Sequence, residues 1–260
     1  MTYTLGIDVG STTSKCVILK DGTEIAGKSL VKLGTGTVGP EQALAAVLED
    51  AGISRDDIAM TVSTGYGRNH VEIADKNMSE LSCHAKGAVF LFPEVATLID
   101  VGGQDVKAMH IENGVLTAFQ MNDKCAAGTG RFLEVLAGAL NVPIDDFGKL
   151  HFASEQSVPI SSTCTVFAES EVISQMSKGS AVKDVIRGIN EAVAAKAVAL
   201  ASRIGITDLL VMTGGAAKNE GIVAAIAEMS GHAVKTSPLA QYNGALGAAL
   251  TAYASCQNQS

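Results

Sequence analysis

The sequence predicts an α/β protein made of two similar units that pack side by side. A strand, a glycine turn and a second strand, with an aspartate and a lysine seven residues apart, occur twice along the chain. An apolar strand that ends in Thr-Gly follows each copy, and apolar residues with helical spacing fill the segments between. Because elements in this order bury one face of a sheet under helices, we expect one sheet per unit and a ligand site in the crevice between the units.

The first copy of the repeat lies at the start of the chain. Residues 5–15 (LGIDVGSTTSK) run from a β-branched strand through a glycine turn into a second strand, which leads to a hairpin turn at Asp21-Gly22. The apolar strand that ends at Thr64-Gly65 follows 56 residues after Asp8. These patterns predict a hairpin and a neighbouring strand in the first unit.

The second copy repeats this order with a longer spacing. Residues 98–107 (LIDVGGQDVK) again place a glycine turn between two strands, and a hairpin turn follows at Asn113-Gly114. The matching strand ends at Thr213-Gly214, 113 residues after Asp100, so the second unit contains about 57 additional residues.

Helical spacing of apolar residues defines the remaining elements. It predicts helices over 41–51, 79–90, 130–140, 165–177, 182–203, 219–229 and 244–254. The repeat boundaries then predict a first domain over 1–95 that also takes a C-terminal helix at about 243–260. The second domain spans 96–242.

Composition and charge exclude several classes of protein. Hydrophobic residues make up 47% of the 260 residues and the net charge is −8, which argues against disorder and against a nucleic-acid surface. Apolar stretches are interrupted by charges such as Lys196, and no basic region with an apolar signal segment precedes the first strand, so we expect a cytoplasmic protein without a membrane span. The chain has five cysteines, an odd number without close pairs, and they are expected to stay reduced: Cys16, Cys83, Cys125, Cys164 and Cys256.

The glycine turns have the chemistry of a phosphate site. Glycine lets backbone N–H groups approach a phosphate closely, and hydroxyl groups and a lysine add hydrogen bonds and charge. Asp8 and Asp100 supply carboxylates that suit Mg²⁺, directly or through water. The phosphate-binding candidates are Gly10, Ser11, Thr12, Thr13, Lys15, Gly102 and Gly103. The alternative is a duplicated fold in which these turns are only structural.

Three further segments connect the sequence to a known family. They are residues 122–132 (NDKCAAGTGRF), 161–171 (SSTCTVFAESE) and 238–247 (PLAQYNGALG). With the glycine turns, they resemble the activators of 2-hydroxyacyl-CoA dehydratases, which belong to the superfamily of acetate and sugar kinases, heat-shock chaperones and actin. The resemblance implies a duplicated actin-like ATPase fold, also called ribonuclease H-like, with two domains and a nucleotide cleft between them.

The resemblance also implies a redox cofactor. It implies one [4Fe-4S] cluster per homodimer, held by Cys125 and Cys164 of each subunit, and a twofold axis would supply the four thiolates that such a cluster needs. Each cysteine precedes a predicted helix, and Gly128 and Thr129 lie between Cys125 and its helix. Free N–H groups at a helix start stabilise thiolates and an anionic cluster, so we expect the helix starts to support the cofactor.

The implied activity is ATP hydrolysis coupled to the transfer of one electron. ATP would change the angle between the domains, and the electron would pass from ferredoxin or flavodoxin to a 2-hydroxyacyl-CoA dehydratase, which it activates for radical dehydration. Asp8 and Asp100 would hold Mg²⁺, and Gly214 and Gly215 with Asn219 would bind the nucleoside. Gln104, next to the second phosphate turn, is a candidate to orient the attacking water.

Three other functions remain open from the sequence. A small-molecule kinase would use the same turns, and a filament-forming actin relative would polymerise with nucleotide, but neither explains the two cysteine motifs. An ATPase subunit of a benzoyl-CoA reductase has similar motifs but works in a permanent complex. The length of the chain favours a separate activator.

Overall fold

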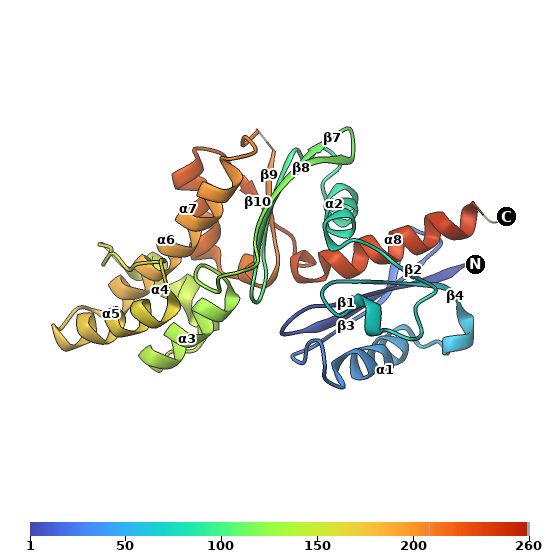
Figure 1. The fold of residues 1–260 in the computed structure, drawn as a ribbon, viewed down its shortest axis with the longest axis horizontal. Coiled ribbons are helices and arrows are strands. Elements are labelled where there is room, and N and C mark those ends of the chain that lie inside the picture. Colours follow the sequence, from blue (N-terminus) through green and yellow to red (C-terminus); the bar gives the residue numbers. More distant parts are fainter. Residues whose placement is uncertain (208, 259–260) are drawn as a thin grey trace. The chain divides into compact units, whose positions relative to one another are not determined.

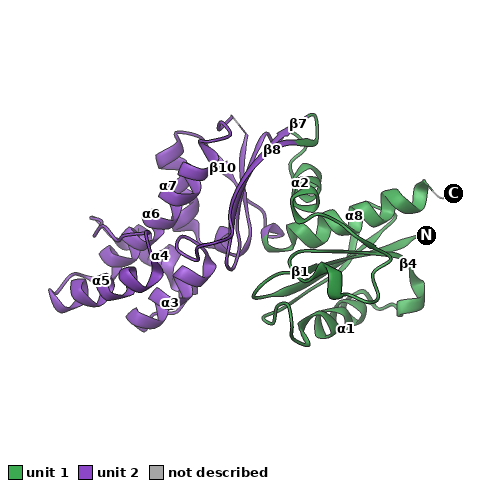
Figure 2. Cartoon of the chain, in the orientation of Figure 1, with its two compact units in different colours: residues 1–94, 113–116, 241–260 green, residues 95–112, 117–240 purple. Residues whose placement is uncertain are grey.

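Two compact units make up the protein, as seen in a computed structural model that describes residues 1–207 and 209–258 (Figure 1). Unit 1 comprises residues 1–94, 113–116 and 241–260, and unit 2 comprises residues 95–112 and 117–240 (Figure 2). Residues 259 and 260, at the end of the segment predicted as a C-terminal helix, lie outside the described residues. In the part that is described, no helix is both long enough and apolar enough to cross a membrane.

Unit 1 is built on a five-stranded sheet in the order β3-β2-β1-β4-β5. Strand β1 pairs antiparallel with β2 and parallel with β4, and β2 pairs antiparallel with β3. The strands are β1 (Tyr3–Val9), β2 (Ser14–Lys20), β3 (Glu24–Val31), β4 (Ile58–Thr64) and β5 (Lys76–Asn77). The α-helices are α1 (Gly39–Ala51), α2 (Glu80–Leu91) and α8 (Asn243–Gln257).

Unit 2 repeats this sheet, in the order β8-β7-β6-β9-β10. Strand β6 pairs antiparallel with β7 and parallel with β9, as β1 does with its two neighbours. The strands are β6 (Thr97–Val101), β7 (Val106–Glu112), β8 (Val115–Asn122), β9 (Leu210–Thr213) and β10 (Val234–Lys235). The helices are α3 (Gly130–Leu140), α4 (Phe147–Ala153), α5 (Thr165–Ser177), α6 (Val182–Ala201) and α7 (Glu220–Ser230).

The common strand order confirms the duplicated, ribonuclease H-like α/β fold. The register agrees in detail, because Asp8 lies opposite Lys15 and beside Thr64, while Asp100 lies opposite Lys107 and beside Thr213. The additional length of unit 2 lies between β8 and β9, where α3, α4 and α5 precede α6. In unit 1 the corresponding connection, between β3 and β4, carries α1.

The predicted helices are present with small shifts at their ends. Helices α3 and α5 have the predicted bounds, whereas α6 ends at Ala201, two residues before the predicted end. The short helix α4 was not predicted, because its seven residues are too few for a helical period to show.

Helices α2 and α8 of unit 1 pack so closely at one point that only a glycine fits between them. Gly247 of α8 lies against the backbone carbonyl of Cys83 in α2, and a Cβ atom added to this glycine would overlap that carbonyl. The site can relax only if one helix moves away from the other. The helix contact therefore depends on the missing side chain.

Alanine at Gly247 should destabilise the protein strongly. We expect Gly247→Ala to lower the free energy of unfolding by about 2–3 kcal/mol or more, since overpacking at a backbone contact forces the helices apart. Gly138→Ala is the matched control, because Gly138 lies exposed in α3 with no atom within 4 Å of an added Cβ. That control should stabilise the protein by about 0.5–1 kcal/mol. Urea unfolding of both variants measures the difference, and equal stabilities would contradict the packing argument.

Candidate functional site

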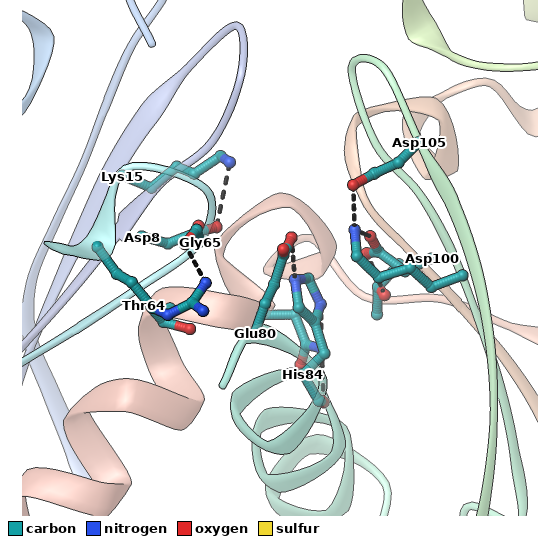
Figure 3. Close-up of polar contacts among 12 residues, drawn as sticks. Asp8, Lys15, Thr64, Gly65, Glu80, His84, Asp100 and Asp105 are labelled. Carbon is teal, nitrogen blue, oxygen red and sulfur yellow. Dashed lines mark hydrogen bonds and ion pairs between the residues drawn. The ribbon is translucent and has the colours of Figure 1, made fainter. Parts of the chain in front are cut away.

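The first glycine turn joins β1 to β2 and closes with a backbone hydrogen bond. The Gly10 N–H donates to the Thr13 carbonyl over 2.9 Å. Beside this turn, near the start of β2, the Lys15 ammonium lies 3.1 Å from an oxygen of Asp8 (Figure 3). Both side chains are largely buried. Lys15 therefore already has a carboxylate partner next to the turn in which it was predicted to bind phosphate.

The Asp8 carboxylate has one oxygen without a protein partner. Within the described residues, Asp8 Oδ1 is buried and accepts no hydrogen bond. Gly65 and Gly244 lie against the carboxylate, and a Cβ atom on either glycine would crowd it. A buried, unsatisfied carboxylate oxygen is costly unless a cation or a donor reaches it, so this atom fits the predicted role of Asp8 toward Mg²⁺ or its waters.

The second glycine turn, between β6 and β7, has the same backbone closure and a different set of charges. The Gly102 N–H donates to the Asp105 carbonyl over 2.9 Å, as Gly10 does to Thr13. Lys107 is 1% exposed, and its ammonium lies 2.7 Å from Asp105 and 3.6 Å from Asp100. The Thr213 hydroxyl donates to Asp100 over 2.8 Å. The side chains of Thr213 and Lys107 therefore help to hold the Asp100 carboxylate in place.

The third turn follows β9, at the point predicted to bind the nucleoside. Gly214 has a φ of +87°, and an added Cβ would overlap the Val101 carbonyl, so glycine is required there. Asn219 caps α7 by accepting hydrogen bonds from the N–H groups of Gly221 and Ile222, and its own amide donates to Asn190. Its side chain thus has a structural task in addition to the nucleoside contact predicted from the sequence. Gly215 is exposed at the start of the turn.

The two candidate cluster cysteines lie in neighbouring loops of unit 2. The Cys125 sulfur lies 4.0 Å from the backbone carbonyl of Thr163, the residue before Cys164. Cys164 is the N-cap of α5, and both cysteines are partly exposed. The fold thus brings together two residues that are 39 positions apart in the sequence.

Backbone hydrogen bonds connect the second glycine turn to the cysteine-bearing segment. The N–H groups of Gly130 and Arg131, at the start of α3, donate to the carbonyls of Gly102 and Gly103 over 2.8 Å each. The prediction that the first N–H groups of this helix are free to support a cluster is wrong for these two residues, because they already donate to carbonyls of the second glycine turn. Thr129 is buried, and its hydroxyl donates to the Ala126 carbonyl.

The remaining predicted residues lie where the turns place them. Ser11 and Thr12 lie in the first turn, and Gln104 is exposed in the second. Each unit gathers its own set of candidates around its own glycine turn. The joining of Asp8 and Asp100 at one Mg²⁺, and the water-orienting role of Gln104, stay predictions.

Sequence reasoning missed several polar residues near these turns. His84 received no role from the sequence. In the structure it is buried, its ring faces Glu80 at 3.8 Å, and an added Cβ on Gly244 would touch both His84 and Asp8 (Figure 3). Asp105 and Lys196 were missed as well. For Lys196 the sequence did hold a sign, since it is a charge within an otherwise apolar helical stretch.

Burial separates Cys16 and Cys83 from the candidate pair, whereas Cys256 is partly exposed. Burial raises the pKa of the Cys16 thiol to about 12 and that of the Cys83 thiol to about 11. Because the thiolate is the reactive form, and a pKa of 11 leaves about one thiol in a thousand ionised at pH 8, neither should react while the protein is folded.

Iodoacetamide should therefore modify Cys125 and Cys164, and leave Cys16 and Cys83 unmodified, in folded iron-free protein at pH 8. Digestion and mass spectrometry identify the labelled residues. The same reaction in urea is the control, in which every cysteine should react. Labelling of Cys16 in the folded protein at its rate in urea would contradict the burial described above.

Comparison with known proteins agrees with these features. The model of the BadF/BadG/BcrA/BcrD ATPase family matches residues 5–252. The (R)-2-hydroxyglutaryl-CoA dehydratase activating ATPase of Acidaminococcus fermentans is 62% identical over 96% of this chain and 97% of its own length. The activator of lactoyl-CoA dehydratase of Anaerotignum propionicum is 52% identical over 99% of this chain and 100% of its own length. The solved activator of the 2-hydroxyisocaproyl-CoA dehydratase from Clostridium difficile, with bound ADPNP, is 47% identical, with a TM-score of 0.97 over 99% of this chain and 97% of that one.

Two of the alternative functions, the benzoyl-CoA reductase subunit and the small-molecule kinase, are represented by more distant similarities. A component of the benzoyl-CoA reductase of Thauera aromatica is 31% identical over 96% of this chain and 93% of its own length. A ROK family glucokinase from Streptomyces griseus is 15% identical, with a TM-score of 0.60 over 96% of this chain and 99% of that one, which shows a shared fold and no more. The duplicated sheets, the paired glycine turns and the match over nearly the whole sequence lead to one conclusion: the chain belongs to the BadF/BadG/BcrA/BcrD ATPase family.

Proposed function

We propose that this chain is an ATPase that activates a 2-hydroxyacyl-CoA dehydratase by transferring one electron to it. The observation that carries the proposal is the backbone connection in unit 2, where Gly102 and Gly103 accept hydrogen bonds from the start of α3. Cys125 lies five residues before that helix. A change at the phosphate turn would therefore move the cysteine-bearing loop directly. The names of the relatives, which are dehydratase activators at 62% and 52% identity, support the same function.

ATP with Mg²⁺ is the proposed substrate. Asp8 and Asp100 would hold the ion directly or through water, the first two glycine turns would bind the phosphates, and Gly214 and Gly215 would lie at the nucleoside. The unsatisfied oxygen of Asp8 supports this assignment, as does the relative solved with ADPNP. Gln104, exposed on the second turn, is proposed to orient the attacking water.

The cysteine pair fits half of an iron–sulfur site. A [4Fe-4S] cluster needs four thiolates, and the two neighbouring loops supply two partly exposed ones. When bound, such a cluster supplies the capacity to take up and release one electron at a time. The residues of this chain would hold it through Cys125 and Cys164, and the ammonium of Lys196 already faces the first of these sulfurs.

A second copy of the chain would complete the site. Beside Cys164, helix α5 exposes a set of large apolar side chains: Val166 is 65%, Phe167 67% and Ile173 53% exposed. Apolar side chains of this size on one helix favour contact with another protein surface. A twofold axis that buries them would bring two cysteine pairs together, so we propose a homodimer with one cluster between its subunits.

The proposed partners follow from the electron transfer. Reduced ferredoxin or flavodoxin would donate the electron, and the dehydratase would accept it in a transient complex in the cytoplasm. The second candidate function is that of an ATPase subunit in a benzoyl-CoA reductase, which the 31% identity to the Thauera aromatica reductase component supports. In that case the protein would be isolated from its source in a stable complex with other subunits.

Anaerobic activation of a purified 2-hydroxyacyl-CoA dehydratase tests the proposal. The reduced protein with MgATP should switch the dehydratase on, and the reduced protein with a non-hydrolysable ATP analogue should not. If the dehydratase stays inactive while ATP is hydrolysed only when a sugar or carboxylate substrate is added, the protein is a kinase and the proposal is wrong.

A further inference from the structure

Lys196 connects the two loops that carry the cysteines. This residue lies on α6, and its ammonium is 3.7 Å from the Cys125 sulfur and 3.4 Å from the Ser162 carbonyl. Ser162 precedes Cys164 by two residues. One side chain from a long helix therefore contacts both cysteine-bearing segments.

The Cys125 loop has a glycine where the Lys196 side chain packs against it. Gly128 has a φ of +82°, a conformation that favours glycine. An added Cβ on Gly128 would come within 2.7 Å of the Lys196 Cδ and 3.1 Å of its Cβ. The glycine in this motif thus makes room for the side chain that reaches the Cys125 sulfur.

The positive charge of Lys196 has no carboxylate partner. Among residues 1–207 and 209–258, Lys196 forms no ion pair with an aspartate or a glutamate, and its side chain is half-buried. Nearby on the same helix, Glu191 pairs with Arg187 instead. A half-buried charge is normally neutralised by an anion, and the group that Lys196 faces is a sulfur that becomes anionic when it binds metal.

We propose that Lys196 is the positioning residue of the cysteine pair, holding the Cys125 loop against the loop of Cys164 and placing a positive charge beside the iron–sulfur cluster. This inference rests on the proposed function. Two consequences follow from it. The loops that hold the cluster are less mobile when the lysine is present, and the reduced cluster, which carries the extra negative charge, is stabilised more than the oxidised one.

Three substitutions at Lys196 separate its charge from its contacts. Lys196→Met removes the charge and the donor while keeping a long apolar stem, Lys196→Gln keeps a donor without the charge, and Lys196→Arg keeps both. Lys178→Met is the matched control, since Lys178 is an exposed lysine at the far end of α5, roughly 20 Å along the helix from Cys164.

Redox titration, iron release to a chelator and hydrogen exchange are measured on the anaerobic full-length protein. In Lys196→Met we expect a more negative reduction potential and about tenfold faster iron release. Lys196→Gln should have the shifted potential with a smaller change in release, while Lys196→Arg and Lys178→Met should resemble the unmodified protein. An unchanged potential and release rate in Lys196→Met, or equal shifts in Lys178→Met, would overturn the inference.

Iron content separates failure of the inference from failure of the proposed function. If the unmodified protein binds no iron, the proposed function is wrong, and hydrogen exchange of the iron-free proteins then decides the positioning role. Faster exchange at 123–129 and 161–164 in Lys196→Met supports that role, and equal exchange overturns it. Should Lys196→Met fail to fold, the comparison of Lys196→Gln with Lys196→Arg decides in the same way.

Discussion

Replacement of either Cys125 or Cys164 by alanine should remove all of the iron from protein purified without oxygen. The proposed homodimer, without substitution, should contain about four irons, with the visible absorption and electron paramagnetic resonance of a [4Fe-4S] cluster. Each substitution deletes two of the four proposed thiolates, because both subunits carry it, and two thiolates do not hold such a cluster. Iron analysis and spectroscopy of the three proteins, side by side, measure this effect.

The remaining cysteines provide the control for this experiment. Cys256→Ala should keep the full iron content, since Cys256 lies in α8 of unit 1, outside the cysteine loops of unit 2. A Cys125→Ala or Cys164→Ala protein that retained a normal cluster would show that the iron is held elsewhere. The cysteine assignment would then be wrong.

Asparagine in place of Asp8 or Asp100 should lower the rate of ATP hydrolysis by about a hundredfold or more. Each substitution keeps the size of the side chain and removes the negative charge proposed to hold Mg²⁺ at the phosphates, where the ion stabilises the charge of the transition state. In the structure these carboxylates lie at the same position of the two repeated hairpins, opposite Lys15 and Lys107. Phosphate release at saturating MgATP is the measurement.

Asp56→Asn is the matched control for the two aspartate variants. Asp56 is exposed in a short helical turn of unit 1, and its substitution changes the charge by the same amount far from the glycine turns in the sequence. Its ATPase rate should equal that of the unmodified protein. Normal ATP hydrolysis in Asp8→Asn or Asp100→Asn would remove these residues from the catalytic site.

The duplicated fold was predictable because its cause is local. Each hairpin has β-branched strands, a glycine turn and a fixed distance from aspartate to lysine, and these patterns specify pairing between neighbouring segments. The register of Asp8 with Lys15 and of Asp100 with Lys107 confirms this prediction. The short helix α4 left no such pattern.

The contacts of the candidate site were less predictable because they depend on segments that are distant in the sequence. Lys196 lies 71 residues after the cysteine that it contacts, and a charge within an apolar helical stretch does not indicate which distant residue it contacts. Asp105 has the appearance of an ordinary turn residue, yet it forms the shorter of the two ion pairs of buried Lys107. The start of α3 was expected to offer free N–H groups, whereas two of them donate to carbonyls of the second glycine turn.

Simultaneous measurement of electron transfer and ATP hydrolysis tests the central claim most directly. Reduced protein is mixed rapidly with a 2-hydroxyacyl-CoA dehydratase in the presence of MgATP, of a non-hydrolysable analogue, or of no nucleotide, and cluster absorbance and phosphate release are followed together. Our account predicts that the protein is oxidised and the dehydratase activated only with MgATP, on the timescale of phosphate release. Equally fast oxidation and activation without nucleotide would contradict the account, as would ATP hydrolysis that leaves the protein reduced and the dehydratase inactive.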